Sequence, residues 1–149
     1  MTITWKACAF SDLNTTELYE LMVLRQEVFV VEQDCPYLDA DGKDLKSFHI
    51  MGYDKGVLAA YARVVVPGTS YDEVSVGRVI VKMPYRGQKL GDALMLQCHD
   101  LVVKKYGKVP IRLSAQSHLK SFYEGLGYSP TGKEYLEDGI PHMEMLVKL

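Results

Sequence analysis

Two basic residues and two glycines stand close together in one short segment of the chain. Arg86, Gly87, Lys89 and Gly91 follow an apolar run and directly precede a helical pattern. The first amide groups of a helix have no partner within the helix, and together with the helix dipole they attract anions. Glycine lets the backbone approach a bulky group, and the basic side chains add positive charge. The segment therefore predicts a phosphate or diphosphate cradle, with an ordinary strand-to-helix turn as the alternative.

The segment does not match the common nucleotide motifs. A P-loop requires the order Gly-x-x-x-x-Gly-Lys-Ser/Thr, which is absent here. The dinucleotide fingerprint requires more glycines than this segment contains. The pattern therefore excludes both of these nucleotide-binding classes.

The elements that must position this segment follow from the spacing of apolar residues. Asn14 followed by Glu17 indicates the start of a helix. That helix runs to about Gln33, and Pro36 ends it. Further helices are expected at residues 90–106 and 117–125, and strands at residues 3–10, 48–53, 57–66, 74–82, 109–115, 128–131 and 142–147. Gly77 indicates a bulge in the fourth of these strands.

The order of these elements predicts the fold class. An antiparallel meander precedes a strand–helix–strand unit, and the crossover in that unit makes its two strands parallel. The class is therefore α/β (α+β), with one mixed sheet covered by helices. A length of 149 residues predicts a single domain that spans residues 1–149.

The composition excludes several classes of protein and of partner. Apolar residues make up 48% and charged residues 24% of the chain, which excludes a disordered, collagenous or disulfide-scaffold protein. The net charge of −2 does not attract nucleic acid or an anionic membrane. Cys8, Cys35 and Cys98 form no C-x-x-C pair, and the chain shows neither a signal peptide nor a membrane-length apolar run. We therefore expect a cytoplasmic protein with reduced thiols, no metal site, and no nucleic-acid or membrane partner.

A family resemblance rests on the basic segment, which reads Arg86-Gly87-Gln88-Lys89-Leu90-Gly91. It resembles the Arg/Gln-x-x-Gly-x-Gly/Ala signature of the GNAT superfamily of acyl-CoA-dependent N-acyltransferases. Lys89 stands where the middle glycine is usual, and a Lys fits there if its backbone angles are helical. Further stretches resemble the ElaA-like subfamily: residues 24–33, 35–37, 76–79, 113–116, 122–128 and 137–142. The resemblance spans nearly the whole chain and implies a GNAT-like fold, with a mostly antiparallel sheet splayed between its fourth and fifth strands.

The resemblance also implies acetyl-CoA as the acyl donor, with no metal. In the GNAT fold, the strand before the signature lies along the pantetheine arm, and the loop holds the pyrophosphate. The strand residues whose backbone would pair with the arm are Val79, Ile80 and Val81. A backbone amide near Ile80 or Val81 would also stabilise the oxyanion. The remaining residues implied to contact the cofactor are Arg86, Gly87, Gln88, Lys89, Leu90, Gly91, Asp92, Gln116 and Tyr123.

Catalytic residues are implied in the same way. Tyr123 matches the tyrosine that many superfamily members place near the cofactor sulfur, where a phenol is a general acid for the leaving thiolate. A core aromatic beside Phe122 is the alternative. Glu32 and His142 are the candidates for a base that accepts the amine proton, directly or through water. Some members of the superfamily need no dedicated base.

Two arginines occupy positions where apolar residues are expected. Arg25 lies within the apolar stripe of the first helix, so its charge needs a partner. It either pairs with a buried carboxylate or lines the pocket of the acceptor. Arg78 lies within a strand and is predicted to line the same cleft. Residues 39–44 superficially resemble a calcium loop, but the glycine comes too early and the Glu at the twelfth position is missing, so a polar loop is expected.

We therefore expect an N-acyltransferase, most simply an N-acetyltransferase, that acts on a primary amine of a small molecule or peptide. The acyl group would pass directly from acyl-CoA to the amine in a ternary complex. The alternatives are a non-catalytic CoA-binding or sensor module and an acyl-homoserine-lactone-type synthase, for which the chain looks too short. The superfamily also leads us to expect a homodimer.

Overall fold

The amino-terminal half of the chain builds a four-stranded antiparallel sheet. The computed structural model describes residues 1–149. The strands are β1 (Thr4–Ala9), β2 (Ser47–Asp54), β3 (Val57–Val65) and β4 (Ser75–Val81), and their order in the sheet is β1-β2-β3-β4. Lys55 and Gly56 both have positive φ angles in the turn between β2 and β3, as a tight hairpin requires. The predicted hairpin and meander are confirmed.

The carboxy-terminal half builds a three-stranded antiparallel sheet with the order β5-β7-β6. Its strands are β5 (Pro110–Gln116), β6 (Ser129–Glu137) and β7 (Ile140–Lys148). The strand predicted at 128–131 was too short, because β6 continues past an irregularity between Pro130 and Glu134 to the turn that follows it. Residues of β6 are almost all exposed, so their sequence lacks the apolar alternation that would reveal a strand.

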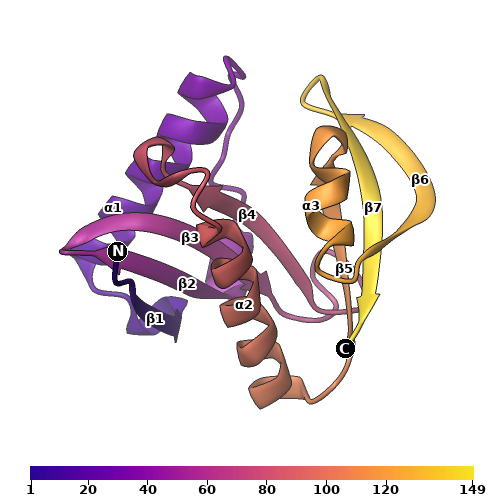
Figure 1. The fold of residues 1–149 in the computed structure, drawn as a ribbon, viewed down its shortest axis with the longest axis horizontal. Coiled ribbons are helices and arrows are strands. Elements are labelled where there is room, and N and C mark those ends of the chain that lie inside the picture. The colour runs from indigo at the N-terminus through magenta and orange to yellow at the C-terminus, as the bar shows by residue number, and fades with distance from the viewer.

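One parallel bridge joins the two sheets and confirms the predicted splay between the fourth and fifth strands. Val74 pairs with Ile111, and the amide of Arg112 donates to the carbonyl of Val74 over 3.1 Å. Beyond this point β4 and β5 diverge, so the two halves of the molecule lean apart (Figure 1).

Helices pack on the sheets and connect them. They are α1 (Thr15–Arg25), continued by a π-helical segment (Gln26–Glu32), α2 (Leu90–Tyr106) and α3 (Lys120–Glu124), with 3-10 turns at Phe10–Asp12, Lys43–Lys46, Met83–Tyr85 and Ser117–Leu119. Asn14 caps α1 as predicted, because its side chain accepts from the amide of Glu17 and the Glu17 side chain accepts from the amide of Asn14. No helix is both long and apolar enough to cross a membrane.

The core has two parts, one on each face of the amino-terminal sheet. Leu94 and Cys98 of α2 belong to the larger cluster, which also takes in the buried faces of β5 and β7. Leu21 and Leu24 of α1 belong to the smaller cluster, together with Ile80 of β4. The strand β4 is therefore packed between α1 and α2, and its outer edge diverges from β5.

The predicted bulge lies in β4, next to Gly77. Tyr61 of β3 pairs with Ile80, whereas Arg63 pairs with Gly77, so β4 has one extra residue at this point. The residue in the left-handed conformation is Arg78, with φ of 50°, and not the glycine. A bulge of this kind redirects the side chains beside it, and Arg78 lines a cavity between the two sheets.

Candidate functional site

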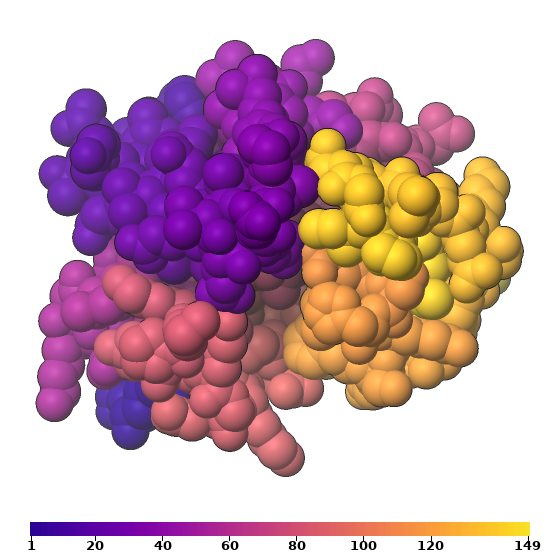
Figure 2. All heavy atoms as spheres, turned by 90° about the horizontal axis from the view of Figure 1, so that it is seen from above, coloured from indigo at the N-terminus to yellow at the C-terminus, as the bar shows by residue number.

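A cavity of about 450 Å³ occupies the space where β4 and β5 separate. Val79 of β4, Gln116 of β5 and Tyr123 of α3 all line it. Two contacts cross it: the Gln116 side chain donates to Gln33 over 3.4 Å, and the thiol of Cys35 donates to the carbonyl of Asp138 over 3.4 Å. The segment after the π-helix therefore forms one wall of the cavity, and Figure 2 shows this segment meeting the carboxy-terminal hairpin above a hollow.

The edge of β4 that faces this cavity has no strand partner. Beyond the bridge at Val74, β4 pairs only with β3. Val79 lines the cavity, whereas the Ile80 side chain is buried in the core against α1. The amide of Lys82 donates to Ala59 of β3, and backbone groups alternate along a strand, so Val79 and Val81 present their backbone groups at the free edge, where a ligand could extend the sheet.

A row of free amide groups continues from the end of β4 into α2. The amides of residues 87–92 find no acceptor in the chain, whereas the amide of Arg86 donates to Met83. Gly87 has φ of 80°, and Lys89 at the N-cap of α2 has φ of 60°. The free amides and the positive end of the helix dipole are the features that the predicted anion cradle requires, and we call residues 86–92 the anion cradle below.

Gly91 and the N-cap residue Lys89 are constrained for different reasons. A Cβ at Gly91 would lie 3.3 Å from the Phe122 ring, so this glycine lets α2 pack closely on α3. Lys89 does not have the helical angles at which a Lys was expected to fit; it has the left-handed conformation, which only a glycine adopts without steric cost. This explains why a glycine is usual at that place in the signature.

Arg86 is fixed by partners on both sides of the loop. Its Nε donates to the carbonyl of Val81 over 2.8 Å, and its terminal nitrogens donate to both oxygens of Glu32 over 2.9 and 3.0 Å. Glu32, predicted as a possible base, is thus engaged at the end of the π-helix. The pair connects the anion cradle to the wall of the cavity.

Tyr123 lines the cavity, and its hydroxyl group has no hydrogen-bond partner in the chain. The residue is 6% exposed, and its ring packs edge-on against Phe122 and Tyr128. The hydroxyl takes part in none of the hydrogen bonds of the chain. Burial raises the pKa of Tyr123 far above its usual value, so the phenol keeps its proton.

His142 and Gln116 are brought together by the register of the second sheet. They are direct partners on β7 and β5. Nδ1 of His142 lies 2.7 Å from the carbonyl of Ile140, which only accepts, so Nδ1 is the protonated nitrogen. Nε2 lies 3.3 Å from Glu137 Oε2.

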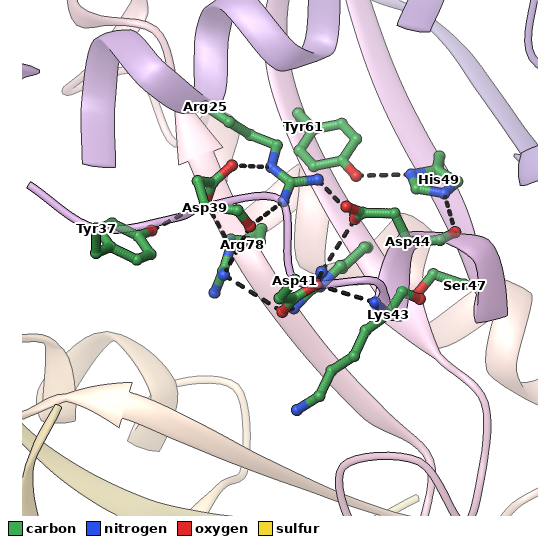
Figure 3. Close-up of polar contacts among 11 residues, drawn as sticks. Arg25, Tyr37, Asp39, Asp41, Lys43, Asp44, Ser47, His49, Tyr61 and Arg78 are labelled. Carbon is green, nitrogen blue, oxygen red and sulfur yellow. Dashed lines mark hydrogen bonds and ion pairs between the residues drawn. The ribbon is translucent and has the colours of Figure 1, made fainter. Parts of the chain in front are cut away.

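Arg25 is buried in a network of opposite charges (Figure 3). It is 0% exposed. Its Nε donates to Asp39 and its Nη1 to Asp44, each over 2.6 Å. Arg25 does not line the cavity. Two roles were considered for Arg25, and the structure shows the first, pairing with buried carboxylates. Arg25 faces the core from its helix, where a buried charge requires such partners.

The same network extends to the cavity wall. It includes aspartates of the segment 39–44, which was expected to be a polar loop, and Arg63, which the sequence analysis did not single out. We define the charge cluster as Arg25, Arg63, Arg78, Asp39, Asp41 and Asp44. Arg63 holds Asp41 through both terminal nitrogens, over 2.8 and 2.6 Å. Burial opposes ionisation of Asp41 and Asp44, but hydrogen bonds and charges from the arginines outweigh it, so the pKa of each carboxyl lies below its usual value. The one signal in the sequence was an arginine, Arg63, within the apolar strand at 57–66.

Arg78, predicted to bind substrate, lies at the cavity side of this charge cluster. Its guanidinium lies 5.8 Å from the ring centres of both Phe29 and Tyr37. Its Nε is 2.8 Å from Asp39 Oδ1. Aromatic faces and a carboxylate thus hold the guanidinium at the wall.

Comparisons with known proteins agree with this arrangement. Residues 25–149 match the family described as acetyltransferase (GNAT) domain. The chain is similar to protein ElaA of Escherichia coli strain K12, with 42% identity over 96% of this chain and 95% of ElaA. It also resembles the crystal structure of an acyl-CoA N-acyltransferase from Pseudomonas aeruginosa, with a TM-score of 0.93, 40% identity, and coverage of 98% of this chain and 99% of that one. An aminoglycoside 6'-N-acetyltransferase complexed with coenzyme A shares the fold, with a TM-score of 0.73, 16% identity, and coverage of 99% and 97%.

The backbone strain at Lys89 can be measured with two variants. Lys89→Gly and Lys89→Ala both remove the charge, but only glycine adopts the left-handed conformation freely. We expect the glycine variant to be more stable than the alanine variant by about 1 kcal/mol, as measured by urea unfolding. Equal free energies of unfolding would contradict a strained backbone at this position.

Removal of the buried guanidinium should destabilise the protein strongly. Arg25→Met leaves Asp39 and Asp44 buried without one of their partners, which lowers the free energy of unfolding by about 3–5 kcal/mol. Arg86→Met breaks a half-exposed pair and should cost no more than about 1 kcal/mol. Denaturant unfolding measures both changes, and similar losses in the two variants would argue against a special role of the buried pairs.

Acid should weaken the charge cluster. The lowered pKa values of Asp41 and Asp44 mean that their stabilising effect is complete above the unfolded-state value of about 3.9 and is lost as the pH falls below it. The free energy of unfolding should therefore decrease from about pH 5 to about pH 3, and less steeply in Asp41→Asn than in the natural protein. Identical pH profiles for the two proteins would rule out this contribution.

Proposed function

Because the chain belongs to the GNAT acetyltransferase family, we propose that it transfers an acetyl group from acetyl-CoA to a primary amine of a small molecule or peptide. The observation that carries this proposal is the row of free amides at residues 87–92, which begins where the unpaired edge of β4 ends. A diphosphate and an extended amide-bearing chain would satisfy these two sets of groups together. A structural relative described as complexed with coenzyme A supports the same ligand.

The residues of the chain fit the demands of acetyl-CoA. The amides of residues 87–92 would hold the diphosphate, and the backbone of Val79 and Val81 would pair with the pantetheine arm. When bound, the cosubstrate supplies a thioester, whose carbonyl carbon accepts the amine. A backbone amide near Ile80 or Val81 would donate to the oxygen of that carbonyl as negative charge develops on it.

Deprotonation of the amine falls to His142 in this proposal. Because Nδ1 of His142 donates to the carbonyl of Ile140, its Nε2 carries the lone pair, and the carboxylate of Glu137 lies 3.3 Å from Nε2. Glu32, the other candidate, is held by both terminal nitrogens of Arg86. We therefore assign the role of base to His142, acting directly or through water.

Tyr123 completes the proton balance. The amine nitrogen forms a bond to the carbonyl carbon, and the carbon–sulfur bond breaks. His142 takes the proton that the amine loses, and Tyr123 gives its proton to the departing thiolate. The phenol is protonated at neutral pH and so carries the proton that the thiolate needs; the pKa that burial raises reduces its acid strength and does not favour the transfer. Direct transfer needs no covalent intermediate on the enzyme, because the site holds both substrates in line.

The proposal also includes the cellular compartment and the oligomeric state of the protein. We place it in the cytoplasm, because the free thiols of Cys8, Cys35 and Cys98 suit a reducing compartment. We treat residues 1–149 as one acyltransferase domain and expect it to work as a homodimer.

Two measurements test the proposal as a whole. Calorimetry with coenzyme A should show binding, and acetyl-CoA with a panel of primary amines should release free thiol. Absence of any binding would overturn the proposal at its foundation. Tight binding without thiol release from any amine would favour a non-catalytic CoA-binding module.

Tyr123→Phe should separate chemistry from binding. Loss of the general acid is expected to lower kcat by about a hundredfold, because acid catalysis contributes on this scale. The affinity for coenzyme A, measured by calorimetry, should stay within about threefold, since the ring and its packing remain. The variant Tyr19→Phe, altered at an exposed tyrosine, is the matched control. An unchanged kcat would remove Tyr123 from the mechanism.

A further inference from the structure

Two sides of the cavity lining carry opposite charge, and we call the side with Lys43 and Arg78 the cationic end and the side at the β6–β7 turn the acidic end. We infer from this that the acceptor amine also bears an anionic group. Lys43 and Arg78 would bind that group, while the amine lies near His142 and Glu137. The inference rests on the proposed function and narrows its acceptor to amines of the amino-acid or amino-phosphate type.

The cationic end holds donors that no group in the chain satisfies. Nζ of Lys43 makes neither a hydrogen bond nor an ion pair, although its residue lines the cavity. Figure 3 shows this amine pointing away from the carboxylates of the charge cluster. The buried side-chain nitrogens without a hydrogen-bond partner are Nε of Arg63 and Nε of Arg78. Nη1 of Arg78 also makes no contact with an acceptor. Unsatisfied buried donors are costly, and with the unpaired amine of Lys43 beside them this side of the cavity suits a ligand oxygen.

The charge balance at the cationic end also favours an anionic group in the ligand. Arginines and aspartates of the charge cluster are equal in number and pair with one another. Lys43 is added to this neutral set, so the wall has a net positive charge. A second cation in the ligand would be repelled here, whereas a carboxylate or phosphate would be attracted.

The opposite end is acidic. Glu137 and Asp138 line the cavity at the turn between β6 and β7, beside His142. This end also holds the proposed base and suits a protonated amine before it loses its proton. An acceptor with an amine and an anion at its two ends therefore matches the cavity along its length. A volume of about 450 Å³ fits a ligand of small-molecule size.

Matched pairs of acceptors test this inference. The standard α-amino acids are compared with their carboxamides, and 3-aminopropyl phosphate with 3-aminopropanol, by thiol release at saturating acetyl-CoA. We expect kcat/KM to be at least tenfold higher for the anionic member of the best pair. The two kinds of pair distinguish a carboxylate from a phosphate. Equal values within every pair would overturn the inference.

Variants show whether Lys43 is responsible. Lys43→Met should raise KM for the anionic acceptor at least tenfold, with kcat and the affinity for coenzyme A nearly unchanged. Lys46→Met is the matched control, because Lys46 is an exposed lysine on the same turn that does not line the cavity. Identical KM values for the two variants would overturn the assignment to Lys43.

Failure of the inference and failure of the proposed function give different results. If no amine releases thiol, the proposed function fails, and calorimetry then tests the site alone. The amino acids and 3-aminopropyl phosphate are titrated into protein saturated with coenzyme A. Binding that is lost in Lys43→Met and kept in Lys46→Met supports the anion site, and absence of binding overturns it.

Discussion

The architecture depends on the separation of two neighbouring strands after a single bridge. The bridge between Val74 and Ile111 joins β4 to β5, and beyond it the two strands diverge and belong to separate sheets. The edge of β4 is thereby left without a strand partner, and backbone groups at such an edge require other partners, as the carbonyl of Val81 finds in Arg86. Because β4 runs directly into the free amides before α2, the unpaired edge and the anion cradle form one continuous surface. The separation thus creates both the cavity and the place where a cosubstrate can lie.

The charge cluster fixes the wall of the cavity. Arg25 connects the end of α1 to the loop at residues 39–44, and Arg63 connects that loop to β3. Pairs of this kind need good geometry to offset the loss of hydration, and here each guanidinium has carboxylate partners. The polar loop consequently has a defined position, which places Lys43 and Arg78 on the cavity wall.

Much of the fold could be predicted from local patterns. The capping residues at Asn14, the hairpin at Lys55–Gly56 and the helix after the basic segment each carry a signal within a few residues. The length of β6 could not be predicted, because its exposed residues show no apolar alternation. The partners of Arg25 were also hidden, since Asp39 and Asp44 lie far from it in the sequence and only tertiary folding joins them. The basic segment predicted the free amides, whereas the pairing of Arg86 with Glu32 depends on how α1 and its π-helical continuation pack.

One short stretch of backbone lies between the anion cradle and the cavity, the two proposed ligand sites. The π-helical segment ends at Glu32, which forms an ion pair with Arg86 beside the anion cradle. The next residue, Gln33, accepts a hydrogen bond from Gln116 across the cavity. If binding of one substrate moved this stretch, the binding site of the other substrate would change as well. Thermodynamic reciprocity then requires that the two substrates influence each other's affinity by the same factor, so any cooperativity between donor and acceptor has an identified physical route through residues 32 and 33.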